Sequence, residues 1–441
     1  MHINEMILVS VDDHVVEPPD MFERHLAPQY KAKAPRIVKS KNGDDMWQYE
    51  GQLRPNVGLN AVAGRPPEEY GYEPTGFDQM RRGCFDVHER IRDMNVNGVL
   101  ASMCFGSFPS FCGKLWATAK DKETALVMLR AYNDWHIDEW CAAYPGRFIP
   151  LAQVPLWDIG LMADEVRRVA AKGCHAVTVP ENMTGVALPS IHDEAWDPFW
   201  KACCDTSTVI CIHIGSAGSP APPSLDAPVE TIMAGVPINC FHASVDLVFS
   251  RALRRFPDLR IALSEGGIGW IPYFLDRIDY LYERHHAWTH QDFGKERPSD
   301  VFRRHFLTCF IDDPTGIKLR DAIGVERISW ECDYPHSDST WPHAPERLMQ
   351  SLDGVADGDI DAITHGNAMR FFQLDAFPKL GGRERCTVGA LRAQAADVDL
   401  TLLRGKGGKA PTEGTPRTVT AGDVLRQLAT ALDGQTNAKS L

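Results

Sequence analysis

The sequence predicts a (β/α)8 barrel with a hairpin-containing insertion after its first strand and a helical tail at its C-terminus. Two observations predict this fold. Eight short apolar runs rich in β-branched residues alternate with longer amphipathic segments, which is the pattern of a parallel β/α protein. Four of these runs end in acidic or histidine side chains, and in a closed parallel barrel all strand ends converge on one face.

Each predicted strand is a short run that passes into a loop containing Gly, Pro or Ser. In chain order, the eight runs span residues 6–14, 98–106, 147–156, 174–182, 208–216, 260–267, 305–313 and 327–335. The seventh run has the weakest pattern, because Cys309 and Phe310 interrupt it. Residues 122–145 and 159–173 are examples of the intervening helices, since their apolar side chains recur every three to four positions.

The barrel domain is predicted to span residues 1–380, with an insertion at about residues 31–85. Within the insertion, Asn42-Gly43 lies between two strand-like arms, which is a strong signal for a tight hairpin. We expect this hairpin to form a flap over the barrel or an interface element.

Residues 381–441 are predicted to form a C-terminal extension. Residues 404–417 are rich in Gly, Pro, Lys and Thr, a composition typical of a linker. The following segment predicts a short amphipathic helix, whose apolar face carries Val424, Leu425, Leu428 and Leu432. A helix of about 15 residues is marginal alone, so we expect it to dock on its own barrel or on a neighbouring subunit.

The composition is that of an ordinary globular protein and argues against several partners. The hydrophobic content is 44%, the charged content is 24% and the net charge is -13, which disfavours nucleic acid or an anionic membrane surface. No uninterrupted apolar stretch reaches the roughly 18 residues of a membrane span, and the N-terminal residues turn acidic too early for a signal peptide. The 12 cysteines are dispersed in apolar settings, which favours reduced thiols and a cytoplasmic location.

The first candidate metal ligands are Asp12 and His14, near the end of the first predicted strand. Side chains two residues apart share one face of a strand, so both can point at the same ion. An isolated Asp-Asp-His triplet is more often a solvated strand end. Its interpretation as a metal site therefore depends on the other strands.

Three further strand ends carry candidate ligands. His213 ends an apolar run just before Gly215-Ser216; alone it would more often be a hydrogen-bonded core residue. Glu265 precedes two glycines, and Asp333 ends the eighth run. A carboxylate in such an apolar setting is costly unless it is paired or bound to a metal. Imidazole and carboxylate groups are ordinary ligands of divalent ions.

Two other histidines are candidate substrate contacts. His336 lies in the loop after the eighth strand, and His192 lies in the loop after the fourth. Both loops leave the barrel on its active-site face. The alternative for His192 is an exposed loop residue without a role in binding.

Taken together, four motifs resemble those of a known superfamily. They are DDHVVEPPD, CIHIGS, LSEGGIGWIPYF and CDYPHSD. The chain resembles the amidohydrolase superfamily, and within it the amidohydrolase-2 branch of aminocarboxymuconate semialdehyde decarboxylase and the resorcylate decarboxylases. The likeness runs over most of residues 5–375, and leaves the insertion and the tail uncovered.

The resemblance implies that Asp12, His14, His213 and Asp333 match the metal ligands of the first, fifth and eighth strands. An acidic residue here replaces the first histidine of the more usual His-x-His pair. The sixth strand often carries a catalytic histidine in this superfamily, and Glu265 takes that place. Glu265 is therefore expected to be a further ligand or a catalytic group. Such a carboxylate-rich set would hold one or two divalent ions, with manganese or iron suited as well as zinc.

These observations predict a metal-dependent hydrolase or non-oxidative decarboxylase that acts on a small carboxylated or amide-bearing substrate. In hydrolysis Asp333 would accept a proton from water, whereas in decarboxylation the ion would stabilise developing negative charge. One alternative is an iron or mixed-metal oxygenase subunit that works with a related subunit. Another is a scaffolding subunit with a structural metal. The resemblance also implies a homo-oligomer, or a hetero-oligomer with a related subunit.

Overall fold

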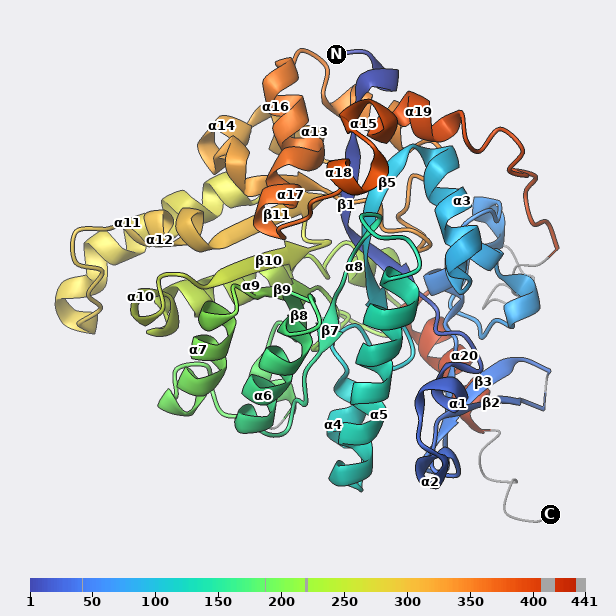
Figure 1. The fold of residues 1–441 in the computed structure, drawn as a ribbon. Helices are drawn as coiled ribbons and strands as arrows, with labels where there is room; N and C mark the ends of the chain where they lie inside the picture. Colours follow the sequence, from blue (N-terminus) through green and yellow to red (C-terminus); the bar gives the residue numbers. More distant parts are fainter. Residues whose placement is uncertain (42, 187, 219–220, 406–416, 434–441) are drawn as a thin grey trace.

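The computed structural model describes residues 1–441 apart from residues 42, 187, 219–220, 406–416 and 434–441. Parallel strands form the centre of the molecule (Figure 1), and each of the eight predicted strands is present. In chain order they are β1 (Leu8–Val15), β5 (Val99–Gly106), the short pair β6 (Phe148–Ile149) and β7 (Ala152–Gln153), β8 (Ala176–Val179), β9 (Val209–His213), β10 (Arg260–Ser264), β11 (Phe306–Phe310) and β12 (Ile328–Trp330). The seventh strand, despite its weak pattern, is confirmed as β11.

The strands are arranged as two arcs that together follow the order of a barrel. One arc has the order β1-β5-β6 and the other has the order β7-β8-β9-β10-β11-β12. The arcs meet at the third strand position, which Pro150 interrupts because proline has no backbone N–H to donate. At the other junction, the Asp333 N–H donates to Asp12 O (2.9 Å) and the His14 N–H donates to Tyr334 O (2.7 Å). These two bonds bring the end of β1 against the loop after β12.

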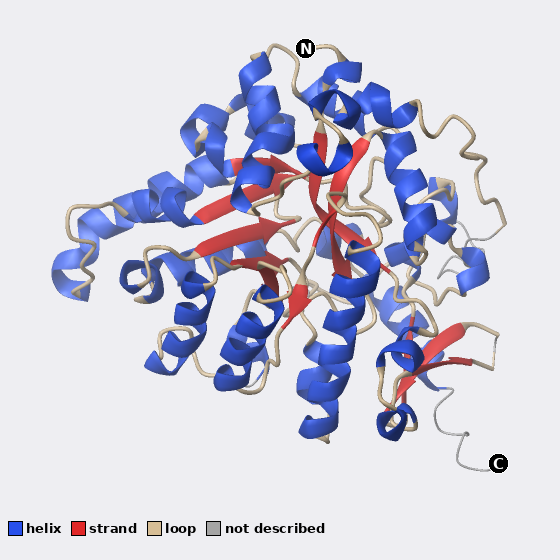
Figure 2. Ribbon diagram, viewed as in Figure 1, coloured by secondary structure: helices blue, strands red, loops and turns tan. Residues whose placement is uncertain are grey.

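Helices cover the outside of the strands (Figure 2). The larger ones are α3 (Val87–Asn97), α5 (Lys122–Trp135), α6 (Ile159–Ala170), α7 (Asp197–Asp205), α9 (Ile238–Phe249), α11 (Ile271–Thr289), α12 (Pro298–His305) and α15 (Ala344–Ser351). Side chains of Asp86, Asp121 and Asp158 accept hydrogen bonds from the first-turn N–H groups of α3, α5 and α6. Such caps satisfy donors that a helix leaves unpaired at its start.

Shorter helices complete the shell around the barrel. They are α1 (Met21–His25), α2 (Pro28–Lys31), α4 (Lys114–Thr118), α8 (Glu230–Met233), α10 (Ala252–Arg255), α13 (Pro314–Lys318), α14 (Arg320–Ile323), α16 (Asp357–Asp361), α17 (Asn367–Phe371), α18 (Phe377–Leu380) and α19 (Val388–Arg392). By length and composition alone, Glu230–Phe249 could cross a membrane, and 28% of this window is buried. It comprises α8 and α9, and α9 packs Cys240, Ala243, Leu247 and Val248 into the core. One such stretch is weak evidence for a membrane span.

The insertion after β1 forms a small antiparallel sheet rather than a single hairpin. Its strands are β2 (Arg36–Lys39), β3 (Asp45–Tyr49) and β4 (Gln52–Pro55), and β3 pairs with both neighbours. The predicted hairpin is β2–β3, with Gly43 at a φ of 90° in its turn; the third strand was not predicted. Trp47 stacks on Phe108 at 4.5 Å between ring centroids, which holds this sheet against the loop after β5.

The C-terminal helix α20 (Ala421–Asp433) docks on its own chain. The Ala421 and Gly422 N–H groups donate to Ala227 O (2.9 Å) and Leu225 O (2.8 Å) in the loop after β9, and α20 also packs beside β4. Val424 is buried, but Leu425 is 53% exposed, so the predicted apolar face is only partly covered. Most of the predicted linker and the side chain of Leu432 lie outside the described residues.

Candidate metal centre

Four strand ends bring five predicted ligands together inside the barrel. Asp12 and His14 lie on β1, His213 is the last residue of β9, Glu265 follows β10, and Asp333 follows β12. The side chains of Asp12, His14, His213 and Asp333 are 0% exposed, and that of Glu265 is 17% exposed. We call these five residues and His336 the metal centre.

His14 lies in the middle of the metal centre. Its Nε2 atom is 3.1 Å from Asp333 Oδ1, 3.6 Å from Asp12 Oδ1 and 3.3 Å from His213 Nε2. His213 Nε2 is in turn 3.1 Å from Glu265 Oε2 and 3.4 Å from Asp12 Oδ2. Potential ligand atoms from segments far apart in the sequence therefore lie close together in one small volume.

His336 joins this group, although the sequence suggested a separate substrate contact. Its ring stacks on His14 with 3.4 Å between ring centroids, and its Nδ1 atom is 3.2 Å from Asp333 Oδ1. One set of potential ligand atoms comes from His14, Glu265, Asp333 and His336, and a second comes from Asp12, His14 and His213. In each set all the atoms lie within 4.8 Å of one another, so His14 belongs to both.

The carboxylates of the metal centre have the chemistry of cation ligands. Among the described residues, no hydrogen-bond donor satisfies either carboxylate oxygen of Asp12 or of Asp333. Burial raises the pKa of both groups well above the usual range, because water cannot solvate the charge. A buried carboxylate without donors is costly, and a bound cation would remove that cost. These orphaned oxygen atoms fit a divalent ion.

The histidines are oriented to offer their Nε2 atoms. His213 Nδ1 is 2.6 Å from Ile214 O, so this nitrogen donates its proton to the carbonyl and leaves Nε2 facing the carboxylates. Burial disfavours the charged form of His213, but Asp12 and Glu265 raise its pKa to about 10. Burial, with His336 and His213 beside it, lowers the pKa of His14 well below its usual value. The carboxylates thus favour one positive charge beside them, which either a proton on His213 or a metal ion can supply.

Sequence reasoning missed several residues that hold the metal centre in place. Glu331 is fully buried directly after β12, and its Oε2 atom accepts from the Glu265 N–H (3.1 Å) and the Cys309 thiol (2.6 Å). A carboxylate in an apolar run is costly unless it is paired, so this setting was the signal that could have found it. Asp13 accepts from the Tyr334 N–H (2.9 Å), which ties the loop after β12 to β1.

Arg90 also supports β1, from a helix rather than from a strand. This buried guanidinium on α3 donates to His14 O (2.5 Å) and Gly83 O (2.7 Å). In the sequence it is one of several charged residues on a helix, and no local pattern distinguishes it from the exposed ones. Only the tertiary structure identifies its role.

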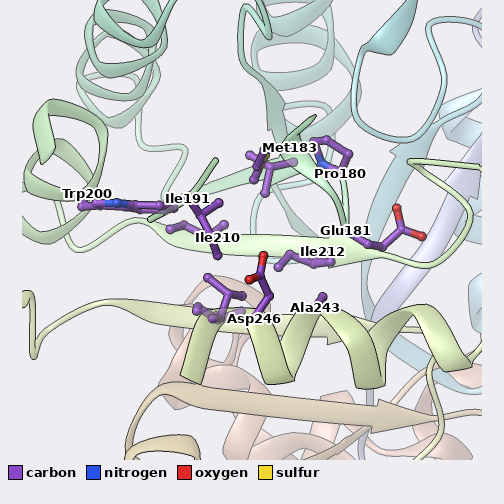
Figure 3. A pocket seen from close by; sticks show the side chains of 12 residues that line it. Pro180, Glu181, Met183, Ile191, Trp200, Ile210, Ile212, Ala243 and Asp246 are labelled. Carbon is purple, nitrogen blue, oxygen red and sulfur yellow. The ribbon is translucent and has the colours of Figure 1, made fainter. Parts of the chain in front are cut away.

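His192 does not join the metal centre. Its side chain is 49% exposed, and its Nε2 atom is 2.8 Å from Asp246 Oδ1 on α9. Asp246 lines a small apolar hollow of ≈ 20 Å³ between β8, β9 and α9 (Figure 3). Ile212 lines that hollow too, and because adjacent strand residues face opposite sides, it lies on the other face of β9 from His213. The role of His192 as a substrate contact therefore gains no support from its position.

Comparisons with known proteins agree with this geometry. The amidohydrolase family model matches residues 22–374. The chain is 25% identical over 339 residues to a gamma-resorcylate decarboxylase of Rhodococcus jostii, a match that covers 72% of this chain and 95% of that protein. It is 24% identical over 338 residues to the gamma-resorcylate decarboxylase of a Rhizobium species, covering 72% and 94%.

Solved structures show the same fold at lower identity. A 2,6-dihydroxybenzoate decarboxylase from Rhizobium has a TM-score of 0.56 and 20% identity, covering 84% of this chain and 99% of that one. A dihydroxybenzoic acid decarboxylase from Polaromonas, solved with manganese and the inhibitor 2-nitroresorcinol, has a TM-score of 0.56 and 18% identity, covering 85% and 99%. An amidohydrolase from Mycobacterium avium has a TM-score of 0.63 and 19% identity, covering 83% and 98%.

Proposed function

We propose that this chain, which belongs to the amidohydrolase family and is an enzyme of it, is a metal-dependent decarboxylase of a small carboxylated aromatic compound. The observation that carries the proposal is the buried metal centre with its orphaned carboxylates. The proposal is also supported by the decarboxylases among the relatives and by the manganese in one neighbouring structure. The relatives named above give no support to an oxygenase or a scaffold.

Asp12, His14, His213 and Asp333 would hold a divalent ion, with Glu265 and His336 as further donors. Manganese suits a set that combines carboxylate and imidazole groups. When bound, the ion supplies Lewis-acid chemistry, which orients substrate oxygen atoms and stabilises negative charge. Asp12 and Asp333 are enclosed on all sides, so in this proposal they bind and do not exchange protons with the substrate.

The substrate would approach from the side of Glu265 and His336, because theirs are the exposed side chains of the metal centre, at 17% and 10%. Decarboxylation breaks the bond between the ring carbon and the carboxyl carbon. Carbon dioxide leaves, the electron pair stays on the ring carbon, and that carbon must then take up one proton. We assign this proton transfer to the Glu265 carboxyl group. Hydrolysis, in contrast, would require Asp333 to accept a proton from water.

The proposal is tested by loading purified protein with manganese and measuring carbon dioxide released from 2,6-dihydroxybenzoate and related hydroxybenzoates. Elemental analysis of protein purified without chelator identifies the resident metal. We expect decarboxylation that is lost on chelation, restored by manganese and absent in His213→Ala. Turnover of amides or esters without release of carbon dioxide would instead assign the protein to the hydrolases of the family.

A further inference from the structure

The aromatic side chain of Phe111 lies against three imidazole rings of the metal centre. The centre of its ring is 4.3 Å from that of His213, 4.8 Å from that of His14 and 5.8 Å from that of His336. These are separations at which aromatic rings interact. The metal binding and the proton transfer proposed above do not involve this ring.

Phe111 differs from the other phenylalanine beside these imidazoles in its access to solvent. Phe105, on β5, is 4.9 Å from His213 between ring centres and is 0% exposed, so it closes the metal centre from inside the barrel. Phe111 comes from the loop after β5 and is only half-buried. Glu265 and His336 are also partly exposed, with 17% and 10% of their side chains accessible. Phe111 is therefore an apolar rim residue of a centre whose other partly exposed groups are polar.

The loop after β5 holds Phe111 in this position from both sides. Ser110, immediately before it, has a φ of 66°, and its carbonyl oxygen accepts a hydrogen bond from Gln153 Nε2 on β7 (3.2 Å). Lys114 Nζ donates to Ala217 O (3.1 Å) in the loop after β9. Residues other than glycine rarely have a positive φ, and those that do are concentrated at functional sites. The placement of the Phe111 ring is thus built into the loop.

We propose that Phe111 is a specificity-determining residue, which makes the metal centre selective for flat, unsaturated rings. This inference rests on the proposed function, because it takes the carboxylated substrate to be held at the metal centre. A substrate ring that enters beside Glu265 and His336 would pack against the ring of Phe111. Two aromatic rings gain affinity from offset-stacked or edge-to-face packing beyond the area that they bury, whereas a saturated ring gains from burial alone.

Benzoate and cyclohexanecarboxylate are the probes that isolate this effect. Both have one carboxylate on a six-membered ring, but only the ring of benzoate is flat and unsaturated. The saturated ring is the more apolar of the two, so a wall that only excluded water would not favour benzoate. Binding of each probe to manganese-loaded full-length protein is measured by calorimetry. The proteins compared are the wild type, Phe111→Leu, Phe111→Tyr and Phe371→Leu.

The expected results follow from the presence or absence of an aromatic ring at position 111. The wild type should bind benzoate at least about threefold more tightly than cyclohexanecarboxylate. Phe111→Leu should lose this preference, because leucine keeps an apolar surface but has no aromatic ring. Phe111→Tyr should keep it, because the ring remains. Phe371→Leu is the matched control and should also keep it, since Phe371 is a half-buried phenylalanine on α17, outside the metal centre.

The outcomes separate the role of Phe111 from the proposed function. Equal affinity for the two probes in the wild type, no binding of either probe, or an unchanged preference in Phe111→Leu would each overturn it. Loss of the preference in Phe371→Leu as well would overturn it too, because the effect would then not be specific to position 111. Release of carbon dioxide from 2,6-dihydroxybenzoate by the same wild-type sample reports on the proposed function independently. If Phe111→Leu does not fold, as judged by thermal unfolding, Phe111→Ile supplies the same test, because it is also apolar and lacks an aromatic ring.

Discussion

Replacing Glu17 by glutamine should remove a pH-dependent contribution to stability beside the metal centre. The Glu17 side chain is 0% exposed just after β1, and it joins this strand to the loop after β5. Its Oε1 and Oε2 atoms accept hydrogen bonds from the Ser107 N–H (3.0 Å) and the Phe108 N–H (2.8 Å). Burial raises the pKa of this carboxyl group from 4.5 to about 7, although the two hydrogen bonds oppose the change.

The direction of the effect follows from proton binding in the two states. Because the pKa in the folded state is the higher one, the folded protein keeps a proton that the unfolded chain releases as the pH rises above about 4.5. The stabilising contribution of Glu17 is therefore complete below this pH and is lost as the pH rises through about 7. At ~1.4 kcal/mol for each pH unit, the loss amounts to about 3 kcal/mol.

The assay compares denaturant unfolding of the wild type and Glu17→Gln from pH 4.5 to pH 8, at equal metal loading. The difference in free energy of unfolding between the two proteins should change by about 3 kcal/mol over this range, with the wild type favoured at low pH. Glu23→Gln, at an exposed position on α1, is the matched control and should show no such change. A constant difference between the wild type and Glu17→Gln would refute the reasoning.

Three other predictions concern the metal centre and the tail. His213→Ala and Asp333→Asn should each lose most bound manganese, measured by elemental analysis, and most turnover, while circular dichroism shows that the fold is retained. The control His192→Ala should keep its metal. Full metal occupancy in the first two variants would contradict the assignment. Glu265→Gln should reduce turnover at least about 100-fold as a proton donor, and lowered metal occupancy as well would make it a ligand. Truncation before Arg404 should weaken oligomer assembly, as measured by light scattering, without removing metal from the metal centre. An unchanged oligomeric state would mean that the tail stabilises only its own chain.

The barrel and its ligand-bearing strand ends could be predicted because both depend on local patterns. Each strand is an apolar run that a loop signal terminates, and parallel topology then places all the strand ends together. Asp12 and His14 were identifiable because residues two apart share a face of β1. Glu331 also lies in an apolar run, and that setting was the signal that could have identified it.

The remaining features depend on contacts between distant segments, which no local pattern encodes. The sequence places His336 on a loop as a candidate substrate contact, and only the path of that loop shows that its ring also stacks on His14. The insertion was expected to hold one hairpin, and its third strand β4 pairs with β3 through a turn at Glu50 and Gly51, which have φ values of 47° and 78°. Glu50 gave no turn signal, because a non-glycine residue rarely has a positive φ.

The geometry of the metal centre depends on contacts between strands that are distant in the sequence rather than on any one strand. Glu265 and Asp333 have φ values of 60° and 58°, in the left-handed region that side chains other than glycine rarely occupy. Each is held there by a hydrogen bond from its own N–H, to Glu331 in one case and to Asp12 O in the other. The conformation of Glu265 therefore depends on contact between the ends of β10 and β12, and that of Asp333 depends on contact between β1 and the segment after β12. The ligand set is therefore completed by the same contacts that complete the fold.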